Sequence, residues 1–393
     1  MKKINISVLG STGSIGINTL AIISKKRNLF SVNTLSANTN YVKICNQLSK
    51  FNPRNFIIIN KKTLKKVKKK FINSKTNFYD NYKNIPVSSM QNDITVAAIP
   101  GLNGLEPTIA FTRKSKKILL ANKESIICGW NLLKNVAKKN NTEIIPIDSE
   151  HFSIKKLLKN YSDIEIEKIY ITASGGPFLN IKKSMFNKIK PAQAIKHPKW
   201  SMGRKISVDS STLMNKILEL MEAQKIFPFK KNKYKIIIHP QSLVHAIISF
   251  KNGLTKFLYH EPNMQIPIAN AIFNFKINIK DFIKNSKKNT SIKNLEFFEV
   301  DKTRFPVINL LPKMDKYIST PIIINAANEI LIDQFLKKKI SFNSISNYIF
   351  LVLKDKNYKK YAIYNPSNLK NIFMIDSWSR KTTLKIIANQ ETG

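Results

Sequence analysis

The chain has 393 residues, of which 43% are apolar, so it is long enough for two or three domains and too apolar to be disordered. No apolar run approaches the roughly 18 residues of a membrane-spanning helix, the first strand-like segment leaves no room for a leader, and two cysteines cannot build a disulfide framework. We therefore expect a cytoplasmic protein. The net charge of +42 rests on 66 Lys and Arg, but only six are Arg, and the lysines are spread over the whole length. Because specific nucleic-acid contacts favour Arg, we expect no specific nucleic-acid partner. The absence of a long apolar run predicts no membrane partner.

Strand-like and helix-like segments alternate from residue 1 to about 147, which predicts an α/β fold with a Rossmann-like, doubly wound parallel sheet. The lysine-rich run 61–71 has apolar residues at helical spacing and indicates a helix with one solvated face. Residues 148–275 mix strands with helices and predict a central α+β domain. Residues 276–301 are polar and lack periodicity, so we expect a linker, and residues 302–393 predict a helical bundle. The helices expected in this bundle span 318–337, 341–354 and 379–389.

Three of only 11 glycines form the motif Gly10-x-x-Gly13-x-x-Gly16 between the first strand and the first helix. Such a loop lets a pyrophosphate approach the N–H groups at the helix N-terminus, although a tight turn without a ligand is the alternative. Sites that prefer NAD place an acid about 20 residues further on, yet no Asp or Glu precedes Asp80. The side chains available near the end of the second strand are Ser36, Asn38, Thr39 and Lys43. The missing carboxylate favours NADP(H).

Two of the scarce acids, Asp148 and Glu150, follow the last strand expected in the first domain. If the chain is extended there, residues i and i+2 point the same way, and both carboxylates face the crevice at the strand ends. A cation or a proton must then offset their repulsion. A later helix adds Glu219 beside Asn215 and Lys216, and oxygen ligands without Cys or His favour Mg²⁺ or Mn²⁺. The alternative for Lys216 and Glu219 is an ordinary ion pair within that helix.

The segment ITASGGPF ends an expected strand in small residues, where successive N–H groups and the Ser174 hydroxyl can bind an anion. The polar run 209–212 is expected to cap the helix that follows it. The predicted phosphate site consists of Ser174, Ser210, Asn215 and Lys216. Amphipathic and aromatic residues in the loop 194–205 suggest a lid that excludes water, while the alternative is a tryptophan packed in the core. The residues of this loop that we single out are His197, Trp200, Met202 and Gly203.

Taken in chain order, several motifs resemble the 1-deoxy-D-xylulose 5-phosphate reductoisomerase family over nearly the whole length. They are GSTGSIG, LLANKES, DSEH, SGGPF, HPKWSMGRKISVDSSTLMNKILE, HPQSLVHA, EPNMQIPIA and NAANE. The resemblance implies an NADPH- and divalent-metal-dependent enzyme that converts the phosphorylated sugar to 2-C-methyl-D-erythritol 4-phosphate in the non-mevalonate isoprenoid pathway. It implies a homodimer with an NADPH-binding domain over 1–147, a catalytic domain with metal site and flap over 148–275, and a C-terminal helical domain.

The resemblance also assigns roles to individual residues. The implied metal ligands are Asp148, Glu150 and Glu219. The implied catalytic residues are the same three acids with Lys216 and His197. The implied substrate contacts are Ser149, Glu150, Ser174, His197, Ser210, Asn215, Lys216 and Glu219, with Trp200 and Met202 in the flap. The cofactor contacts predicted from the glycine loop and the resemblance are Gly10, Ser11, Thr12, Gly13, Ser14, Ile15, Gly16, Asn38, Asn40, Asn122, Lys123, Glu124 and Gly203.

Two features depart from the family pattern. Asn38-Thr39-Asn40 stands where a basic residue is expected near the 2′-phosphate, with Lys43 one turn on as its substitute, and Phe152 follows DSEH in place of a small or polar residue. A cysteine-dependent semialdehyde-type dehydrogenase would share the glycine loop, but its candidate nucleophile, Cys128, has the apolar setting of a buried structural thiol. A basic nucleic-acid-binding protein is the second alternative, predicted only by charge.

Overall fold

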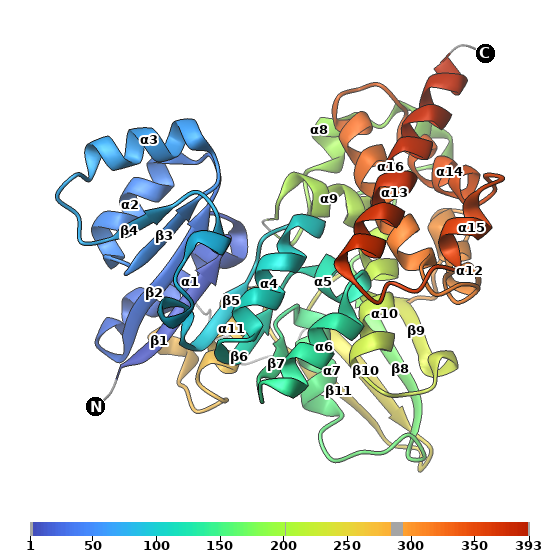
Figure 1. Ribbon diagram of the computed structural model, residues 1–393. Coiled ribbons are helices and arrows are strands. Elements are labelled where there is room, and N and C mark those ends of the chain that lie inside the picture. Colours follow the sequence, from blue (N-terminus) through green and yellow to red (C-terminus); the bar gives the residue numbers. More distant parts are fainter. Residues whose placement is uncertain (1–2, 201, 284–293, 392–393) are drawn as a thin grey trace. The chain divides into compact units, whose positions relative to one another are not determined.

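The computed structural model describes residues 3–200, 202–283 and 294–391, which fall into two compact units (Figure 1). The first unit contains the described residues of Met1–Ser125, Asn131–Phe152 and Met264–Ile292. The second contains those of Ile126–Trp130, Ser153–Asn263 and Lys293–Gly393.

Seven parallel strands form the sheet of the first unit, in the order β4-β3-β2-β1-β5-β6-β7 (Figure 1). They are β1 (Ile4–Leu9), β2 (Phe30–Ala37), β3 (Asn55–Ile58), β4 (Asn77–Tyr79), β5 (Asn92–Ala97), β6 (Ser115–Leu120) and β7 (Glu143–Pro146). β1 pairs with β2 on one side and with β5 on the other, so the chain order reverses at this strand. The carboxyl end of β1 therefore lies at the position where open α/β sheets bind their ligands.

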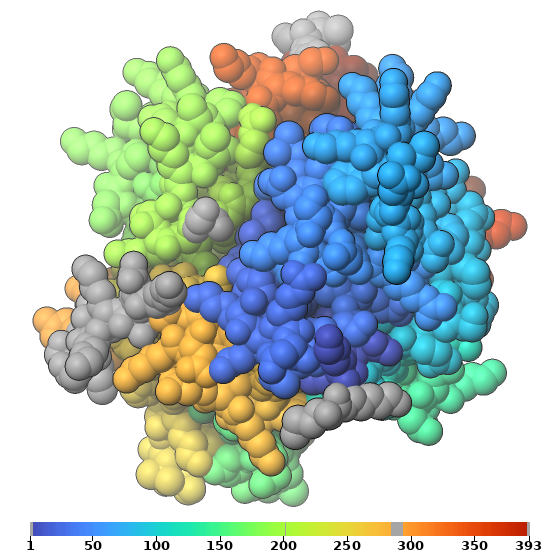
Figure 2. Space-filling view, turned by 90° about the vertical axis from the view of Figure 1, so that its left-hand side faces the viewer, coloured from blue at the N-terminus to red at the C-terminus, as the bar shows by residue number. Residues whose placement is uncertain are grey.

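Helices connect these strands, as the alternating pattern predicted. They are α1 (Ser14–Lys25), α2 (Tyr41–Phe51), α3 (Lys61–Lys70), α4 (Leu105–Thr112), α5 (Lys123–Ile127), α6 (Trp130–Lys139) and α7 (Ser149–Leu157). The lysine-rich run forms α3, as expected, with Thr63 and Val67 buried and its lysines exposed. Figure 2 shows this light-blue segment at the surface.

The predicted domain boundaries differ from the compact units: residues 126–130 belong to the second unit, which also unites the predicted catalytic and C-terminal helical domains. Residues 148–152 belong to the first unit because the chain turns directly from β7 into α7. Residues 264–283 also return to the first unit: α11 (Gln265–Ile272) packs against α1, and the Phe282 ring lies 5.4 Å from the Phe273 ring. The part 276–283 is therefore no linker, because its few apolar side chains join the core. Residues 284–293 of the predicted linker lie outside the described residues.

The second unit has a mixed sheet of four strands in the order β11-β10-β8-β9. These are β8 (Ile166–Ala173), β9 (Tyr234–Ile238), β10 (Val244–Phe250) and β11 (Thr255–Tyr259), and only β8 and β9 run parallel. The helices that follow β8 in the chain are α8 (Pro191–Ala194), α9 (Arg204–Ser211) and α10 (Met214–Ile226). Every residue of α10 from Met214 to Ala223 is buried, and the helix packs against β8 and β9.

The C-terminal part is helical, as predicted, and packs around α13. Its helices are α12 (Leu311–Met314), α13 (Thr320–Leu336), α14 (Phe342–Val352), α15 (Tyr358–Ala362) and α16 (Leu369–Glu391). The expected helix 379–389 in fact begins ten residues earlier, because Ile372 and Ile375 supply a buried face before the predicted start. The fold class predicted from the sequence is confirmed.

Candidate active site

The glycine loop between β1 and α1 brings the backbone close together at the carboxyl end of the sheet. Gly10 has a φ of +83°, and a Cβ on this residue would lie 2.5 Å from the carbonyl oxygen of Ala98. A Cβ on Gly16 would lie 2.4 Å from the carbonyl oxygen of Gly10. No side chain caps the N-terminus of α1, which also has no acid in its first turn. The N–H groups of this turn are thus suited to an anion.

Ser11 holds this loop to helix α2 by hydrogen bonds with Gln47. Its side chain is fully buried, and its hydroxyl donates to Gln47 Oε1 at 2.6 Å, while Gln47 Nε2 donates to the Ser11 carbonyl oxygen at 2.9 Å. The residues left at the surface of the loop are Thr12, Gly13, Ser14 and Ile15. Ser11 therefore fixes the backbone of the predicted cofactor loop and is too buried to contact the cofactor with its side chain. Its partner Gln47 lies 36 residues away, and no local pattern predicts this contact.

The residues after β2 stand where NAD-binding proteins have an acid and where this family is expected to have a basic residue. Asn38 and Asn40 are exposed, and the Asn40 side chain caps α2 by accepting from the Lys43 N–H at 3.1 Å. The Lys43 ammonium group donates to the carbonyl oxygen of Thr12 at 3.3 Å. Lys43 thus places a positive charge beside the glycine loop, where the sequence suggested it as a substitute.

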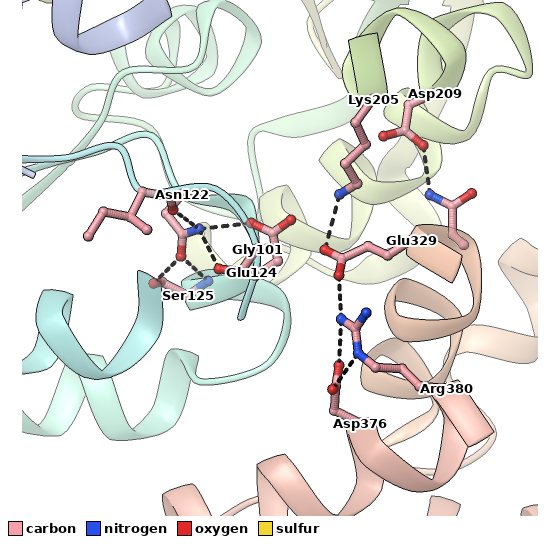
Figure 3. A network of polar contacts seen from close by, with 11 residues as sticks. Gly101, Asn122, Glu124, Ser125, Lys205, Asp209, Glu329, Asp376 and Arg380 are labelled. Carbon is pink, nitrogen blue, oxygen red and sulfur yellow. Dashed lines mark hydrogen bonds and ion pairs between the residues drawn. The ribbon is translucent and has the colours of Figure 1, made fainter. Parts of the chain in front are cut away.

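Asn122 joins three parts of the first unit (Figure 3). Its amide nitrogen donates to the carbonyl oxygens of Ile99 and Gly101, at 2.7 and 3.1 Å, and to Glu124 Oε2 at 2.8 Å. Its amide oxygen accepts from the Ser125 N–H at 2.8 Å. Since the side chain is buried and its donors are used, Asn122 holds the loop after β5 and the start of α5.

Asp148 and Glu150 lie where β7 passes into α7. The expectation that this stretch is extended is wrong, because Asp148 Oδ1 accepts from the Glu150 N–H at 3.2 Å and so caps a helix that begins at Ser149. Lys123 Nζ lies 2.9 Å from Asp148 Oδ2, and the Ser149 hydroxyl donates to Glu150 Oε2. His151 Nδ1 lies 3.3 Å from Asp148 Oδ1. Both carboxylates remain at the carboxyl end of the sheet, with Glu150 buried.

Glu219 belongs to the second unit, where α10 buries it almost completely, with 2% of its side chain exposed. Lys216 Nζ lies 2.7 Å from Glu219 Oε2, and the Asn215 amide donates to Glu219 Oε1. The helical ion pair considered from the sequence therefore exists. A buried pair of this kind is unlike an exposed one, since it has been removed from water and needs these hydrogen bonds.

Ser174 and His197 form a hydrogen-bonded pair in the second unit. Their Oγ and Nε2 atoms lie 2.9 Å apart, and His197 Nδ1 accepts from the N–H groups of Lys199 and Trp200 at 3.1 and 3.0 Å. Nδ1 therefore carries no proton, and Nε2–H donates to Ser174. Burial, and then the nearby charge of Lys216, lowers the pKa of His197 to about 4. The imidazole is neutral at ordinary pH.

Ser174 Oγ also accepts from the Gly176 N–H at 3.1 Å. With both acceptor positions occupied by protein groups, the hydroxyl proton of Ser174 points elsewhere and is available to an anion. Gly175 and Gly176 have φ values of +78° and +66°, so the SGG turn needs its glycines. The anion-binding turn stays a prediction, and the Gly176 N–H within it is bonded to Ser174 Oγ.

Of the run 209–212, expected to cap the helix after it, Thr212 alone bonds to the first residue of that helix, while the other three belong to the helix before it. Asp209 and Ser210 are the last turn of α9, and the chain turns at Leu213, which has a φ of +67°, before α10 starts at Met214. The Met214 N–H lies 3.4 Å from the Thr212 hydroxyl. The sequence concealed this break, because a bulky leucine is a rare residue in the left-handed region.

The predicted flap residues have separate surroundings. Trp200 is partly buried and lies edge-on to His245, with ring centroids 5.9 Å apart. Gly203 is exposed, its φ is ordinary, and nothing lies within 4 Å of an added Cβ. His245 in turn stacks on His260 at 3.8 Å, and burial lowers the pKa of His260 to about 3. Sequence reasoning missed this histidine pair, which is 15 residues apart in the chain.

Cys128, the nucleophile of the alternative dehydrogenase, is buried, with 2% of its surface exposed. Among the described residues no helix is long and apolar enough to cross a bilayer. A seven-stranded parallel sheet with a glycine loop at the point of strand reversal, joined to a second α/β unit, defines a dinucleotide-dependent oxidoreductase.

Comparison with known proteins specifies this class. The family models for 1-deoxy-D-xylulose 5-phosphate reductoisomerase match residues 6–129, and those for its C-terminal domains match 144–227 and 260–382. The reductoisomerase of Pelagibacter ubique is 43% identical over 382 residues, covering 95% of this chain and 96% of its own. That of a Wolbachia from Drosophila simulans is 38% identical over 403 residues, covering 99% of each.

Solved structures agree. A reductoisomerase crystallised with NADPH, fosmidomycin and magnesium superimposes with a TM-score of 0.91 at 30% identity, over 99% of both chains. The enzyme of Zymomonas mobilis in complex with NADPH gives a TM-score of 0.87 at 30% identity, over 98% of this chain and 99% of its own. The chain belongs to the 1-deoxy-D-xylulose 5-phosphate reductoisomerase family.

Proposed function

We propose that the chain catalyses the NADPH-dependent rearrangement and reduction of 1-deoxy-D-xylulose 5-phosphate to 2-C-methyl-D-erythritol 4-phosphate, and that the reaction requires Mg²⁺ or Mn²⁺. Membership of the family supports this activity, and related structures contain NADPH, magnesium and fosmidomycin. The observation that carries the proposal is the Ser174–His197 pair, in which a neutral imidazole and a backbone N–H fix a hydroxyl that is ready to donate to an anion.

The substrate phosphate would be bound by groups of the second unit. The residues that we assign to it are Ser174, His197, Ser210, Asn215 and Lys216. Neutral His197 adds no charge, so Lys216 supplies the positive charge at the anion, while His197 orients Ser174. Binding the unreactive phosphate in this way orients the reacting end of the substrate. Trp200 and Met202 would exclude water from the site.

We assign the divalent cation to the carboxylates of Asp148, Glu150 and Glu219. The ligands are carboxylate oxygens, which Mg²⁺ and Mn²⁺ prefer. Glu150 and Glu219 are buried, and the Asp148 side chain is mostly buried. When bound, the cation supplies Lewis-acid polarisation of the substrate's carbonyl and hydroxyl oxygens. The lysines already beside these acids, Lys123 and Lys216, offset their charge and orient them.

The cofactor would occupy the carboxyl edge of the sheet in the first unit. The uncapped N–H groups at the start of α1 would bind the pyrophosphate, and the exposed loop residues Thr12 to Ile15 would contact it. Lys43 lies beside the loop and is the cation that we assign to the 2′-phosphate of NADPH. Asn122, Lys123, Glu124 and Gly203 complete the proposed nicotinamide side. Apart from Gly203 of the second unit, the proposed cofactor contacts lie in the first unit, and the proposed phosphate contacts lie in the second.

The proposed activity is tested by following NADPH oxidation at 340 nm with 1-deoxy-D-xylulose 5-phosphate, with and without EDTA and with fosmidomycin. We expect metal-dependent consumption that fosmidomycin blocks. A Cys128→Ser variant should keep the activity, because the thiol is buried. Consumption that ignores EDTA, or that Cys128→Ser abolishes, would favour the cysteine-dependent alternative instead.

The metal assignment has its own test. Asp148→Asn should lower turnover by about a hundredfold or more, because it removes a charged ligand, while the affinity for NADPH stays the same. The matched control is Asp281→Asn, which removes an exposed acid paired with Lys26 in the same unit. Unchanged turnover in Asp148→Asn, measured at limiting Mg²⁺, would remove Asp148 from the site.

We also propose that the protein is a cytoplasmic homodimer without a specific nucleic-acid partner. Family membership supports the dimer, and the scarcity of arginine supports the absence of specific nucleic-acid binding. Sedimentation equilibrium should give twice the monomer mass, and any DNA binding should be weak, unspecific and abolished by moderate salt. A monomer in sedimentation, or binding that depends on DNA sequence, would contradict these assignments.

A further inference from the structure

Helix α9 occupies a critical place in the second unit. It begins at Arg204, directly after the flap residues Trp200 and Met202, and its last turn contains Ser210, which we assign to the substrate phosphate. The helix has only eight residues, and short helices are marginal without tertiary contacts. Whatever holds α9 therefore sets the position of the flap's end and of a phosphate ligand together.

Two adjacent residues of α13 contact both turns of α9 (Figure 3). Asn328 Nδ2 donates to Asp209 Oδ1 at 2.6 Å, and Glu329 Oε1 lies 3.3 Å from Lys205 Nζ. Lys205 and Asp209 are four residues apart, so they lie on one face of α9. α13 thus contacts the first and the last turn of α9 from one side.

The contact at Asp209 is the better protected of the two. Asp209 is 2% exposed and Asn328 is fully buried, so their hydrogen bond is shielded from water. A buried carboxylate that loses a hydrogen-bond donor is destabilised more than an exposed one, because water cannot replace the lost bond. The Lys205–Glu329 pair is more open, since 35% of the lysine side chain is exposed, and salt will weaken it.

Glu329 is itself fixed by the last helix. Arg380 of α16 donates to Glu329 Oε2, and it also binds both oxygens of Asp376, with distances of 2.7 Å from Nε and 3.1 Å from Nη2 (Figure 3). Two-pronged contacts of this kind set the orientation of both partners. The line Asp376–Arg380–Glu329–Lys205 therefore connects α16 through α13 to α9.

We infer that Asn328 and Glu329 are positioning residues of the reaction: from the C-terminal helices they fix α9, and through it the flap and Ser210, for binding of the phosphorylated substrate. This inference rests on the proposed function of Ser210 and the flap. The C-terminal helical part is thus more than a structural cover, because it determines the geometry of the substrate site without contacting substrate.

The test uses an exchange of donor and acceptor. Asn328→Asp places two carboxylates opposite each other and should raise the KM for 1-deoxy-D-xylulose 5-phosphate by about tenfold or more, in line with the usual cost of a lost bond to a charged group. The affinity for NADPH should change less, because most of the proposed cofactor contacts lie in the first unit and only Gly203 adjoins α9. Adding Asp209→Asn restores a donor opposite an acceptor, so the double variant should regain most of the wild-type KM.

The control separates positioning from loss of stability. Ile349→Val shortens a buried side chain of α14 and lowers the stability of the same helices without touching α9. It should leave KM unchanged. A KM that rises equally in Ile349→Val, a wild-type KM in folded Asn328→Asp, or an exchange that rescues nothing would each overturn the inference.

Hydrogen exchange gives a reading that does not need activity. In α9 the Ser207 N–H donates to Gly203, and the Thr212 N–H that follows the helix donates to Val208. Protection of these two amides should fall in Asn328→Asp and return in the exchange variant. If the wild type consumes no NADPH, the proposed function fails, whereas unchanged protection in Asn328→Asp shows that the tether itself is wrong.

Discussion

At the scale of single residues, the proposed substrate site depends on the protonation state of His197. His197 accepts two backbone N–H groups at Nδ1, and this fixes the tautomer in which Nε2–H faces Ser174. The serine is then left with one role toward a ligand, that of a donor. The pair therefore discriminates in favour of an anion and against a ligand that could only donate.

Replacing Ser174 by alanine tests this reading. Ser174→Ala removes one hydrogen bond to a charged group, which corresponds to about a tenfold to hundredfold loss in affinity for the phosphorylated substrate. We expect a higher KM for the phosphorylated substrate and an unchanged affinity for NADPH. Ser184→Ala, at an exposed position of the same unit, is the control. Equal kinetics for both variants would exclude Ser174 from the phosphate site.

Three histidines with lowered pKa values, His197, His239 and His260, predict how stability depends on pH. The pKa of His197 falls to about 4 and that of His260 to about 3, in both cases chiefly because burial disfavours the charged form. Below the ordinary pKa of about 6.5, the unfolded chain then binds more protons than the folded one. The free energy of unfolding should decrease as the pH falls below this value and reach its plateau above it.

Urea unfolding at pH 7 and at pH 5 measures this dependence. His260→Gln removes one of these titrating groups, so its stability should fall less between the two pH values than that of the wild type. An equal or steeper fall in the variant would show that the histidine is already protonated in the folded protein.

At the scale of helices and strands, the cofactor site depends on close approach at the glycine loop. Gly16→Ala places a Cβ 2.4 Å from the Gly10 carbonyl oxygen, so the backbone of the loop must move. We expect at least about a tenfold weaker affinity for NADPH and a lower melting temperature, since strain of this kind costs about 1–3 kcal/mol. Fluorescence titration with NADPH and a thermal melt measure the two effects.

Gly203→Ala is the contrast for stability. Nothing lies within 4 Å of the added Cβ, and the backbone there is ordinary, so the melting temperature should stay the same or rise slightly. If Gly16→Ala melts like Gly203→Ala and binds NADPH normally, the loop does not need its third glycine.

Patterns along the chain predicted these elements where one local rule decides. The alternation of strands and helices, the glycine loop and the amphipathic α3 all follow from periodicity and turn chemistry. The sequence could not show that Asp148 caps α7, because a capping acid and an acid in an extended strand look alike in a short apolar stretch. Likewise α11 joins the first unit through contacts across more than 200 residues, which no local pattern encodes.

Those residues of the candidate site that lie within sequence motifs could be predicted. Ser174, Asn215, Lys216 and Glu219 were predicted, and the structure places the last three in bonded contact on α10. The residues that position these site residues could not be predicted. Gln47, His260 and Asn328 act through partners distant in sequence, so only the folded chain reveals them.

At the scale of the whole molecule, the charge of +42 must cost stability by self-repulsion. Salt should therefore raise the melting temperature between about 0.01 M and 0.15 M NaCl, as the Debye length falls from about 30 Å to about 8 Å. Exposed pairs such as Lys26–Asp281 oppose this trend only weakly. A melting temperature that falls with salt would mean that ion pairs outweigh repulsion.

The position of Arg380 has a consequence for how such a sequence can change over generations. A single A-for-G exchange turns the arginine codon AGA into the lysine codon AAA, and in a chain with 66 basic residues nearly all have ended as lysine. A lone ammonium cannot bind the Asp376 carboxylate in two-pronged fashion and Glu329 at once with fixed geometry. Mutation of arginine to lysine should therefore be tolerated across the surface and selected against at Arg380. There a single base change would weaken the contacts that hold Glu329, and through it the proposed substrate site.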